Sequence, residues 1–449
     1  MPGAPGVPVF SIATSVLCLV FICLVPLAVA GIALMNTGLG SLRSAAHSMM
    51  ASLCVFSVAV LVDFIWGESL QGFAGLPSHA VTLGGKSWSW LGSGSLFLRH
   101  LPLNGSPASL AALLGLVSVG VVALIPLGSG ADRWRLTAAC ISTAILAGIA
   151  FPIFAHWAWG GGWLAQLGSS YGMGRGFIDA GGSGAIAAVG GLAALGMAWI
   201  LRPRRGKYTP DGMPNAIPGH NAVFVVFGCV LALLGWWGLN SAGAMLYFGV
   251  PPGQVVLIVV NTTLSAAAAA LTAAIITGVR FGRPDASLTA NGWTGGLVAS
   301  SAGCAFVAPL ASVAIGIVAG VLVALSVEWF ELHLSVDDPG GSISAFALGG
   351  LWGLLSVAIF ARVPAGAFES AHEMVAGQSG QWLAQLIGIA TLIGLIFPLL
   401  YGSNWLLNRF IPQRVAAEGE RQGLDLYELG AGAYPETVTH GDEFARGGS

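Results

Sequence analysis

Charged residues are scarce in this sequence. Only 8% of its 449 residues are Asp, Glu, Lys or Arg, whereas soluble domains carry about 25%. Hydrophobic residues make up 55% of the chain, and the mean hydropathy is +0.82. This composition excludes a soluble globular domain and indicates a polytopic membrane protein.

Signs of enzymatic chemistry are lacking as well. The six cysteines lie in apolar runs without CxxC spacing, which predicts small core residues rather than disulfides or metal ligands. The eight histidines show no metal-ligand spacing, and we find no nucleophile–base pair or nucleotide-binding loop. The formal net charge of −2 does not favour nucleic acid as a partner. We therefore expect no enzyme, no cofactor and no metal.

Long apolar runs are abundant, and they predict an all-α fold with eleven transmembrane helices. Each run is long enough to cross a bilayer as a helix. The uncharged stretch 286–327 is too long for one helix, so we divide it near Pro309. The predicted helices are 10–36, 44–66, 108–128, 136–157, 180–201, 221–244, 253–279, 286–308, 310–330, 343–361 and 381–408.

The Lys and Arg residues predict the orientation. With the N-terminus outside, thirteen of the 17 basic residues lie on the inner side, as the positive-inside rule requires. The loop 67–106 is then outside and has too few distinguishing features to be a separate domain. We divide the chain into a transmembrane domain, 1–409, and an acidic cytoplasmic tail, 410–449.

One stretch stands out as a candidate site. Trp159 is followed by three glycines, and Asp179 precedes Gly-Gly-Ser at the start of the apolar run 180–201. An acid there can cap the free N–H groups of the first helical turn. A second interpretation is compatible with the first: the cap also fixes an ion-binding mouth, where the Trp159 ring attracts a cation.

Two more acids lie at the end of an apolar run. Asp63 and Glu68 are five residues apart, so on an α-helix they share a face only loosely. An ionisable group within a membrane indicates function by default. We interpret Glu68 as most simply placed at the interface, in water, and we keep Asp63 and Glu68 as a possible outer acidic site.

Several motifs together resemble the ammonium transporter family (Amt/Mep/Rh), in the same order and over nearly the whole chain. The motifs are His156-x-x-Trp159-Gly-Gly-Gly, Asp179-x-Gly-Gly-Ser, Pro218-Gly-His220-Asn221, Gly235-Trp236-Trp237-Gly238-Leu239-Asn240 and Asp337-Asp338-Pro339. In the tail, Gly423-Leu424-Asp425-Leu426 and Gly432-Ala433-Tyr434 resemble the family's C-terminal region.

The resemblance implies a fold, an assembly and a solute. It implies a 5+5 inverted repeat plus a long C-terminal helix, in a homotrimer of the cell (inner) membrane with one pore per subunit. It also implies ammonium or ammonia as the solute, with Trp159, Asp179 and Asn240 at the outer binding site. A PII-type regulator at the tail is implied too, although Leu429-Gly430-Ala431 stands where His-Gly-Glu is usual.

The pore lining departs from the family pattern. The two pore histidines fall on Ile186 or Ala187 and on Phe346, and Leu239 replaces a gate phenylalanine. Two further replacements are Gly243 for a serine at the mouth and Glu68 for a tyrosine.

These departures leave three outcomes open. Neutral ammonia crosses without charge, a different polar path uses Asp63 or Glu68, or Phe346 closes the pore and the protein binds or senses its ligand. We expect passage of ammonia, ammonium or a similarly small solute. A non-transporting sensor is the alternative.

Overall fold

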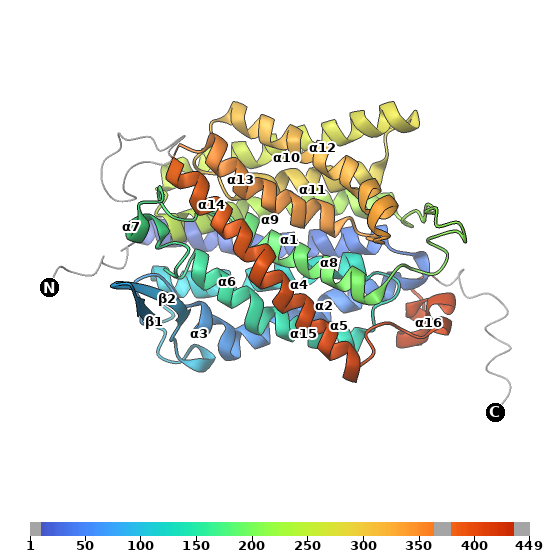
Figure 1. Cartoon of the computed structure of the whole chain (residues 1–449), viewed down its shortest axis with the longest axis horizontal. Helices are drawn as coiled ribbons and strands as arrows, with labels where there is room; N and C mark the ends of the chain where they lie inside the picture. Colours follow the sequence, from blue (N-terminus) through green and yellow to red (C-terminus); the bar gives the residue numbers. More distant parts are fainter. Residues whose placement is uncertain (1–9, 363–378, 435–449) are drawn as a thin grey trace.

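The computed structural model describes residues 10–362 and 379–434 as a bundle of long helices (Figure 1). The β1–β2 hairpin lies at one end of the bundle and α16 at the other, and we call these the hairpin end and the tail end. The elements are α1 (Ile12–Leu39), α2 (Ala45–Val62), α3 (Glu68–Gln71), β1 (Ser78–Leu83), β2 (Lys86–Gly92), α4 (Pro107–Gly130), α5 (Leu136–Ile145), α6 (Phe151–Ala158), α7 (Leu167–Tyr171), α8 (Val189–Leu201), α9 (Ala222–Phe248), α10 (Val255–Phe281), α11 (Ala286–Ser301), α12 (Pro309–Leu334), α13 (Gly349–Phe360), α14 (Ser379–Thr391), α15 (Phe397–Phe410) and α16 (Ala417–Gln422).

Ten helical stretches within the described residues are long and apolar enough to cross a membrane. They correspond to ten of the eleven predicted ranges, and an all-α polytopic membrane protein is confirmed. The remaining range, 286–308, is helical over a shorter length than predicted, because α11 has 16 residues and ends at Ser301. Beyond it the chain is irregular, and Asn261 donates to the carbonyl oxygens of Cys304 and Val307, each at 2.9 Å. Non-helical backbone is tolerated at membrane depth where protein buries it in this way.

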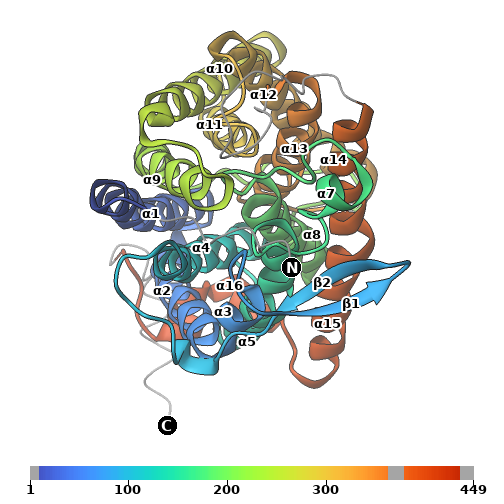
Figure 2. The same ribbon diagram turned by 90° about the vertical axis from the view of Figure 1, so that its left-hand side faces the viewer.

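The loop between α3 and α4 contains the two-stranded antiparallel hairpin β1–β2, which the sequence did not predict. Figure 2 views the bundle from the hairpin end and shows the hairpin near α3. Trp157 of α6 donates to the Trp90 carbonyl oxygen at 2.9 Å, and the Trp163 N–H donates to the Ser89 carbonyl oxygen at 3.0 Å. The hairpin is thereby attached to the stretch that contains Trp159.

Two short segments of similar sequence begin helices from opposite ends of the bundle. Asp179 precedes the π-helical segment Ser183–Ala188 and α8, and Asp338 precedes the π-helical segment Ile343–Leu348 and α13. Each aspartate accepts a hydrogen bond from the N–H five residues later, at 3.0 Å for Asp179 and 2.7 Å for Asp338. The same local device therefore starts both helices, as an inverted repeat requires.

The two helices cross at glycines in equivalent positions, twelve residues after each aspartate. A Cβ on Gly191 would come 2.2 Å from the Ala347 nitrogen, and a Cβ on Gly350 would come 2.4 Å from the Ser183 carbonyl oxygen. Only glycine permits backbones this close. In this repeat, Ala187 and Phe346 both stand eight residues after their aspartate and are equivalent.

The long C-terminal helix that the family resemblance implies is present. It runs through α14 and α15 as one membrane-spanning stretch, Gly380–Phe410. Figure 1 shows it crossing the bundle diagonally. The described part of the tail then folds back: the Asp425 carboxylate accepts from the His47 N–H at 2.7 Å and from the Ala46 N–H at 3.2 Å. Glu428 accepts from the Leu136 N–H at 2.9 Å. Two tail acids thus cap the N-termini of α2 and α5.

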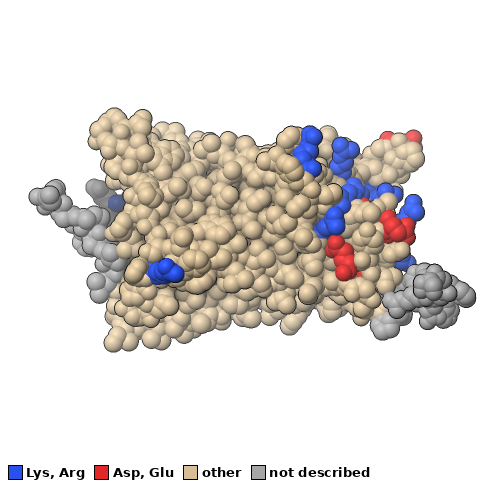
Figure 3. All heavy atoms as spheres, turned by 90° about the horizontal axis from the view of Figure 1, so that it is seen from below, with Lys and Arg blue, Asp and Glu red and all other residues tan. Residues whose placement is uncertain are grey.

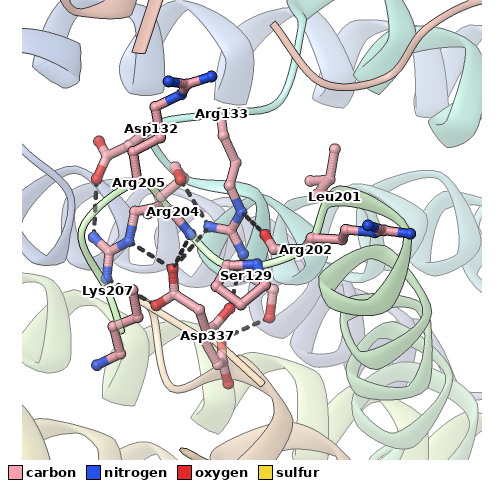
Figure 4. A network of polar contacts seen from close by, with 12 residues as sticks. Ser129, Asp132, Arg133, Leu201, Arg202, Arg204, Arg205, Lys207 and Asp337 are labelled. Carbon is pink, nitrogen blue, oxygen red and sulfur yellow. Dashed lines mark hydrogen bonds and ion pairs between the residues drawn. The ribbon is translucent and has the colours of Figure 1, made fainter. Parts of the chain in front are cut away.

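Buried ion pairs close the tail end (Figure 4). Arg204 binds Asp337 through Nε at 2.9 Å and Nη2 at 3.0 Å, and it reaches Asp132 at 3.0 Å. Arg133 is fully buried and donates to the Asp337 carbonyl oxygen at 2.8 Å. This network joins the chain after α4, after α8 and after α12, which lie far apart in the sequence.

Candidate functional site

The hairpin end is hollowed by a vestibule of about 610 Å³. Its wall combines aromatic and aliphatic side chains with two arginines, Arg175 and Arg362. The aromatic residues are Trp159, Phe177, Tyr247, Phe248 and Phe306. Aromatic ring faces attract a cation that has lost part of its water, so this vestibule fits a small cation or a small neutral solute.

Trp159 forms the inner wall of the vestibule, and the structure brings it against Asp179. The Trp159 side chain is 4% exposed, and its Nε1 donates to the Asp179 carbonyl oxygen at 2.7 Å. The ring of Tyr247 stacks on the indole, with centroids 4.7 Å apart and planes at 4°. These two contacts hold the indole in one orientation beside the vestibule.

The carboxylate of Asp179 is fully buried and acts as a helix cap. Its Oδ2 accepts from the N–H groups of Gly184 at 3.0 Å and Ala185 at 2.8 Å. Its Oδ1 has no hydrogen-bond partner within the described residues. The equivalent Asp338 uses its second oxygen to accept from Ser129 at 2.6 Å. The capping interpretation therefore fits, and one oxygen of Asp179 remains for a further interaction.

Asn240 lies on the other side of the Asp179 segment. Its Nδ2 donates to Thr262 at 2.8 Å, and a Cβ on Gly181 would come 2.0 Å from its Oδ1. That oxygen is buried and has no partner within the described residues. The structure therefore groups Trp159, Asp179 and Asn240 around one short segment, as the sequence predicts, although their role in binding stays a prediction.

Below this segment the predicted pore positions are apolar and buried. The side chains of Ile186 and Ala187 are each 1% exposed, Leu239 is 2% exposed and Phe346 is 4% exposed. The Phe346 ring lies 6.4 Å from the ring of Trp236, centroid to centroid. The described histidines lie elsewhere: His156, for example, donates from Nδ1 to the Gln71 carbonyl oxygen at 2.8 Å.

Glu68 is half-buried, so it lies only partly in water. Its Oε2 is buried and lacks a hydrogen-bond partner within the described residues, as do both carboxylate oxygens of Asp63. The expectation that the two acids share a face only loosely fails. Residues Asp63–Gly67 form a π-helical turn, in which the Glu68 N–H donates to the Asp63 carbonyl oxygen. Residues five apart lie on one face of such a turn.

Sequence reasoning missed two residues here, Tyr247 and Gln71. Tyr247 follows Asn240 by seven residues on α9, a spacing that places both on one face of a helix. That spacing was a usable signal. Gln71 is 1% exposed and lies one turn after Glu68 in α3. Its burial depends on the folded loop, and no local pattern indicates it.

Comparisons with known proteins agree with this architecture. A model of the Ammonium Transporter Family matches residues 16–434. Ammonium transporter Amt2 of Archaeoglobus fulgidus is 35% identical over 419 residues, covering 91% of this chain and 85% of the relative. Ammonium transporter Amt2 of Haloferax mediterranei is 30% identical over 421 residues, covering 91% and 86%.

Solved structures give the same result. A Sensor Amt Protein superposes with a TM-score of 0.81 at 28% identity, covering 92% of this chain and 97% of its own. Mep2 of Candida albicans has a TM-score of 0.76 at 24% identity, covering 91% and 87%, which supports the fold alone. The relatives are transporters, so the prediction that this chain is not an enzyme is confirmed.

Proposed function

Because this chain belongs to the ammonium transporter family, we propose that it passes ammonia, ammonium or a similarly small solute through a pore without histidine. The solute would enter at the vestibule, beside Trp159, behind which Asp179 and Asn240 are buried. The observation that carries the proposal is the equivalence of Ala187 and Phe346 in the repeat. Both positions are buried, and neither side chain binds a proton.

The apolar lining limits what can cross. Moving an ion from water into a low-dielectric protein interior costs roughly several kcal/mol per charge, even after the protein relaxes. Ile186, Ala187, Leu239 and Phe346 offer neither charge nor hydrogen bonds to offset that cost. A paired-imidazole lining would relay a proton, and these residues do not. The proposed flux is therefore of neutral ammonia, without net charge.

Electrical recording on solid-supported membranes tests this directly. An ammonium pulse should give no sustained current in liposomes where the internal pH rises as ammonia enters. Replacing Ala187 and Phe346 by histidine together provides the matched comparison, and this variant should gain current. A sustained current in the wild type that Asp179→Ala abolishes would refute the proposal.

The second candidate is a non-transporting binding or sensor protein in which Phe346 closes the pore. The likeness to a Sensor Amt Protein, at 28% identity over 92% of this chain, favours it. Growth of a yeast strain without its own ammonium transporters separates the two. Rescue by this chain would exclude the sensor, and failure to rescue by a protein that is properly folded in the membrane would support it.

We also propose the family's assembly and orientation for this chain: a homotrimer in the cell (inner) membrane, with the tail end in the cytoplasm. Figure 3 supports the orientation, because basic and acidic side chains on this face gather mainly at the end that carries α16. The orientation is tested by replacing Asp211, an exposed residue in the loop between α8 and α9, with cysteine and labelling that thiol. Labelling of Asp211→Cys from outside intact cells would overturn it. A PII-type regulator at the tail remains a proposal for pull-down tests.

A further inference from the structure

A group of polar side chains with buried, unpartnered atoms lies beside the vestibule. They come from the end of α2, from α3 and from α9, and they are Asp63, Glu68, Gln71 and Tyr247. Six of their atoms are buried without a hydrogen-bond partner within the described residues: both Asp63 carboxylate oxygens, Glu68 Oε2, both Gln71 amide atoms and the Tyr247 hydroxyl. Asp63 is fully buried and Gln71 is 1% exposed. Such orphaned groups are rare in folded proteins and call for an explanation.

The local backbone directs two of these side chains to one place. The π-helical turn Asp63–Gly67 puts Asp63 and Glu68 on the same face. Gly115 of α4 lies against Glu68 and Gln71. A Cβ there would come 3.0 Å from Glu68 Oε2, 3.5 Å from Gln71 Oε1 and 3.7 Å from Gln71 Nε2. The carboxylate and the amide therefore converge over a glycine.

Tyr247 connects this group to the vestibule. One face of its ring stacks on Trp159, which lines the vestibule. Its hydroxyl faces the Gln71 side chain without completing a hydrogen bond, and Glu68 and Asp63 lie within electrostatic range. Tyr247 is therefore shared between the vestibule wall and the group that contains the acids.

The charges need a partner that the described side chains do not supply. None of the ion pairs among the described residues includes Asp63 or Glu68. A buried carboxylate without a partner is unfavourable by several kcal/mol, as an order of magnitude. Protons or a bound cation would remove that cost. Carboxylate, amide and hydroxyl oxygens suit a cation that donates several hydrogen bonds at once.

We propose that Asp63, Glu68, Gln71 and Tyr247 form a second binding site, which takes one monovalent cation of the ammonium class. One cation neutralises one carboxylate, and the other acid keeps its proton. The site deepens the proposed function, since it takes the same solute that the vestibule admits. It lies to the side of the Ala187–Phe346 position and does not depend on passage through the pore.

Diffraction from crystals of the wild-type protein soaked in thallium(I) acetate tests the site, because thallium(I) resembles ammonium in size and charge and scatters anomalously. The expected result is an anomalous peak between Glu68 and Asp63, on the side of Gly115, that excess ammonium chloride removes. A peak in the vestibule without a peak beside the acids would overturn the proposal.

Isosteric variants provide the second measurement. Asp63→Asn and Glu68→Gln, singly and combined, keep volume and remove charge. The concentration of ammonium chloride that half-maximally raises the thermal midpoint should increase about tenfold or more in the double variant, the loss expected for one charged hydrogen bond. Asp211→Asn, at an exposed loop position, is the matched control and should behave as the wild type.

Gly115→Ala tests the site without changing charge. The added methyl group would stand 3.0 Å from Glu68 Oε2, while alanine favours the helix. Thallium occupancy beside the acids should fall, and the vestibule peak should persist. Unchanged occupancy in both Gly115→Ala and the double variant would overturn the proposal.

The same measurements separate this inference from the proposed function. If ammonia flux persists in the wild type but no thallium binds beside Asp63 and Glu68, only the second site fails. If thallium binds there and flux is absent, the site stands and the transport proposal fails. Folding of each variant is checked by the unfolding midpoint without ammonium.

Discussion

Removing the charge of Asp337 should destabilise the tail end more than any other single carboxylate-to-amide change in the ion pairs described. Asp337 is 1% exposed and accepts three hydrogen bonds from Arg204: from the backbone N–H at 2.8 Å, from Nε at 2.9 Å and from Nη2 at 3.0 Å. Arg133 lies 3.7 Å away, and its side chain is fully buried. In Asp337→Asn, both guanidinium groups lose this negative partner, although Asp132 still neutralises part of the Arg204 charge.

The magnitude follows from the burial. Breaking a buried ion pair by removing one partner is unfavourable by about 3–5 kcal/mol. Asparagine still accepts one hydrogen bond, so we expect the lower end, about 3 kcal/mol. Glu328→Gln is the control: Glu328 pairs with Arg280 at 2.7 Å, but both side chains are about 40% exposed. Such pairs contribute about 0–1 kcal/mol.

The pH dependence gives an independent check. Burial opposes ionisation of Asp337, but its hydrogen bonds to Arg204 and the charge of Arg133 outweigh burial, so the pKa of Asp337 lies below its usual 3.8. The stabilisation that the Asp337 carboxylate provides is then complete above its usual pKa of 3.8. It is lost only as the pH falls through the lower pKa of the folded protein. The difference between wild type and Asp337→Asn should stay constant from about pH 5 to pH 9.

Unfolding in detergent, followed by tryptophan fluorescence against denaturant, measures both quantities. A loss below about 1 kcal/mol, equal to that of Glu328→Gln, would refute the argument from burial. So would a difference between wild type and variant that disappears between pH 5 and pH 9.

Two further predictions concern packing and the tail. Gly235→Val should prevent folding, because even a Cβ there would come 2.1 Å from the Ala28 nitrogen; yield of folded protein in detergent measures this, and normal yield would contradict it. Glu428→Gln should release the tail, because Glu428 binds His47 Nε2 at 2.7 Å and caps α5; limited trypsin digestion should cut at Arg421 several times faster. Burial opposes ionisation of Glu428, but the hydrogen bonds from His47 and the Leu136 N–H prevail and lower its pKa. In the wild type, this contribution to tail docking is complete above the usual pKa and is lost as the pH falls through the lowered value. The ratio of the cleavage rates of Glu428→Gln and wild type, which cancels the protease's own pH dependence, should therefore not be larger at acidic than at neutral pH, and a larger ratio at acidic pH would contradict this account.

The sequence by itself determined the class of protein and most of its membrane-spanning segments. A run of about twenty apolar residues is a local property of the sequence, and it is long enough to span the hydrocarbon core as a helix. It also predicted the grouping of Trp159 with Asp179, because both residues lie in motifs that resemble those of the ammonium transporter family. It did not predict that α11 ends at Ser301, before the irregular chain that Asn261 of α10 binds.

Only the tertiary structure decided how the acids and the pore positions are arranged. The pairing of Ala187 with Phe346 in the repeat depends on Asp179 and Asp338 capping their helices in the same way. The burial of Glu68 Oε2 needed the π-helical turn that begins at Asp63 and the close approach of Gly115. The physical reason is the same in each case: whether a side chain meets water, hydrocarbon or another polar group depends on segments that are distant along the chain, and no local pattern records them.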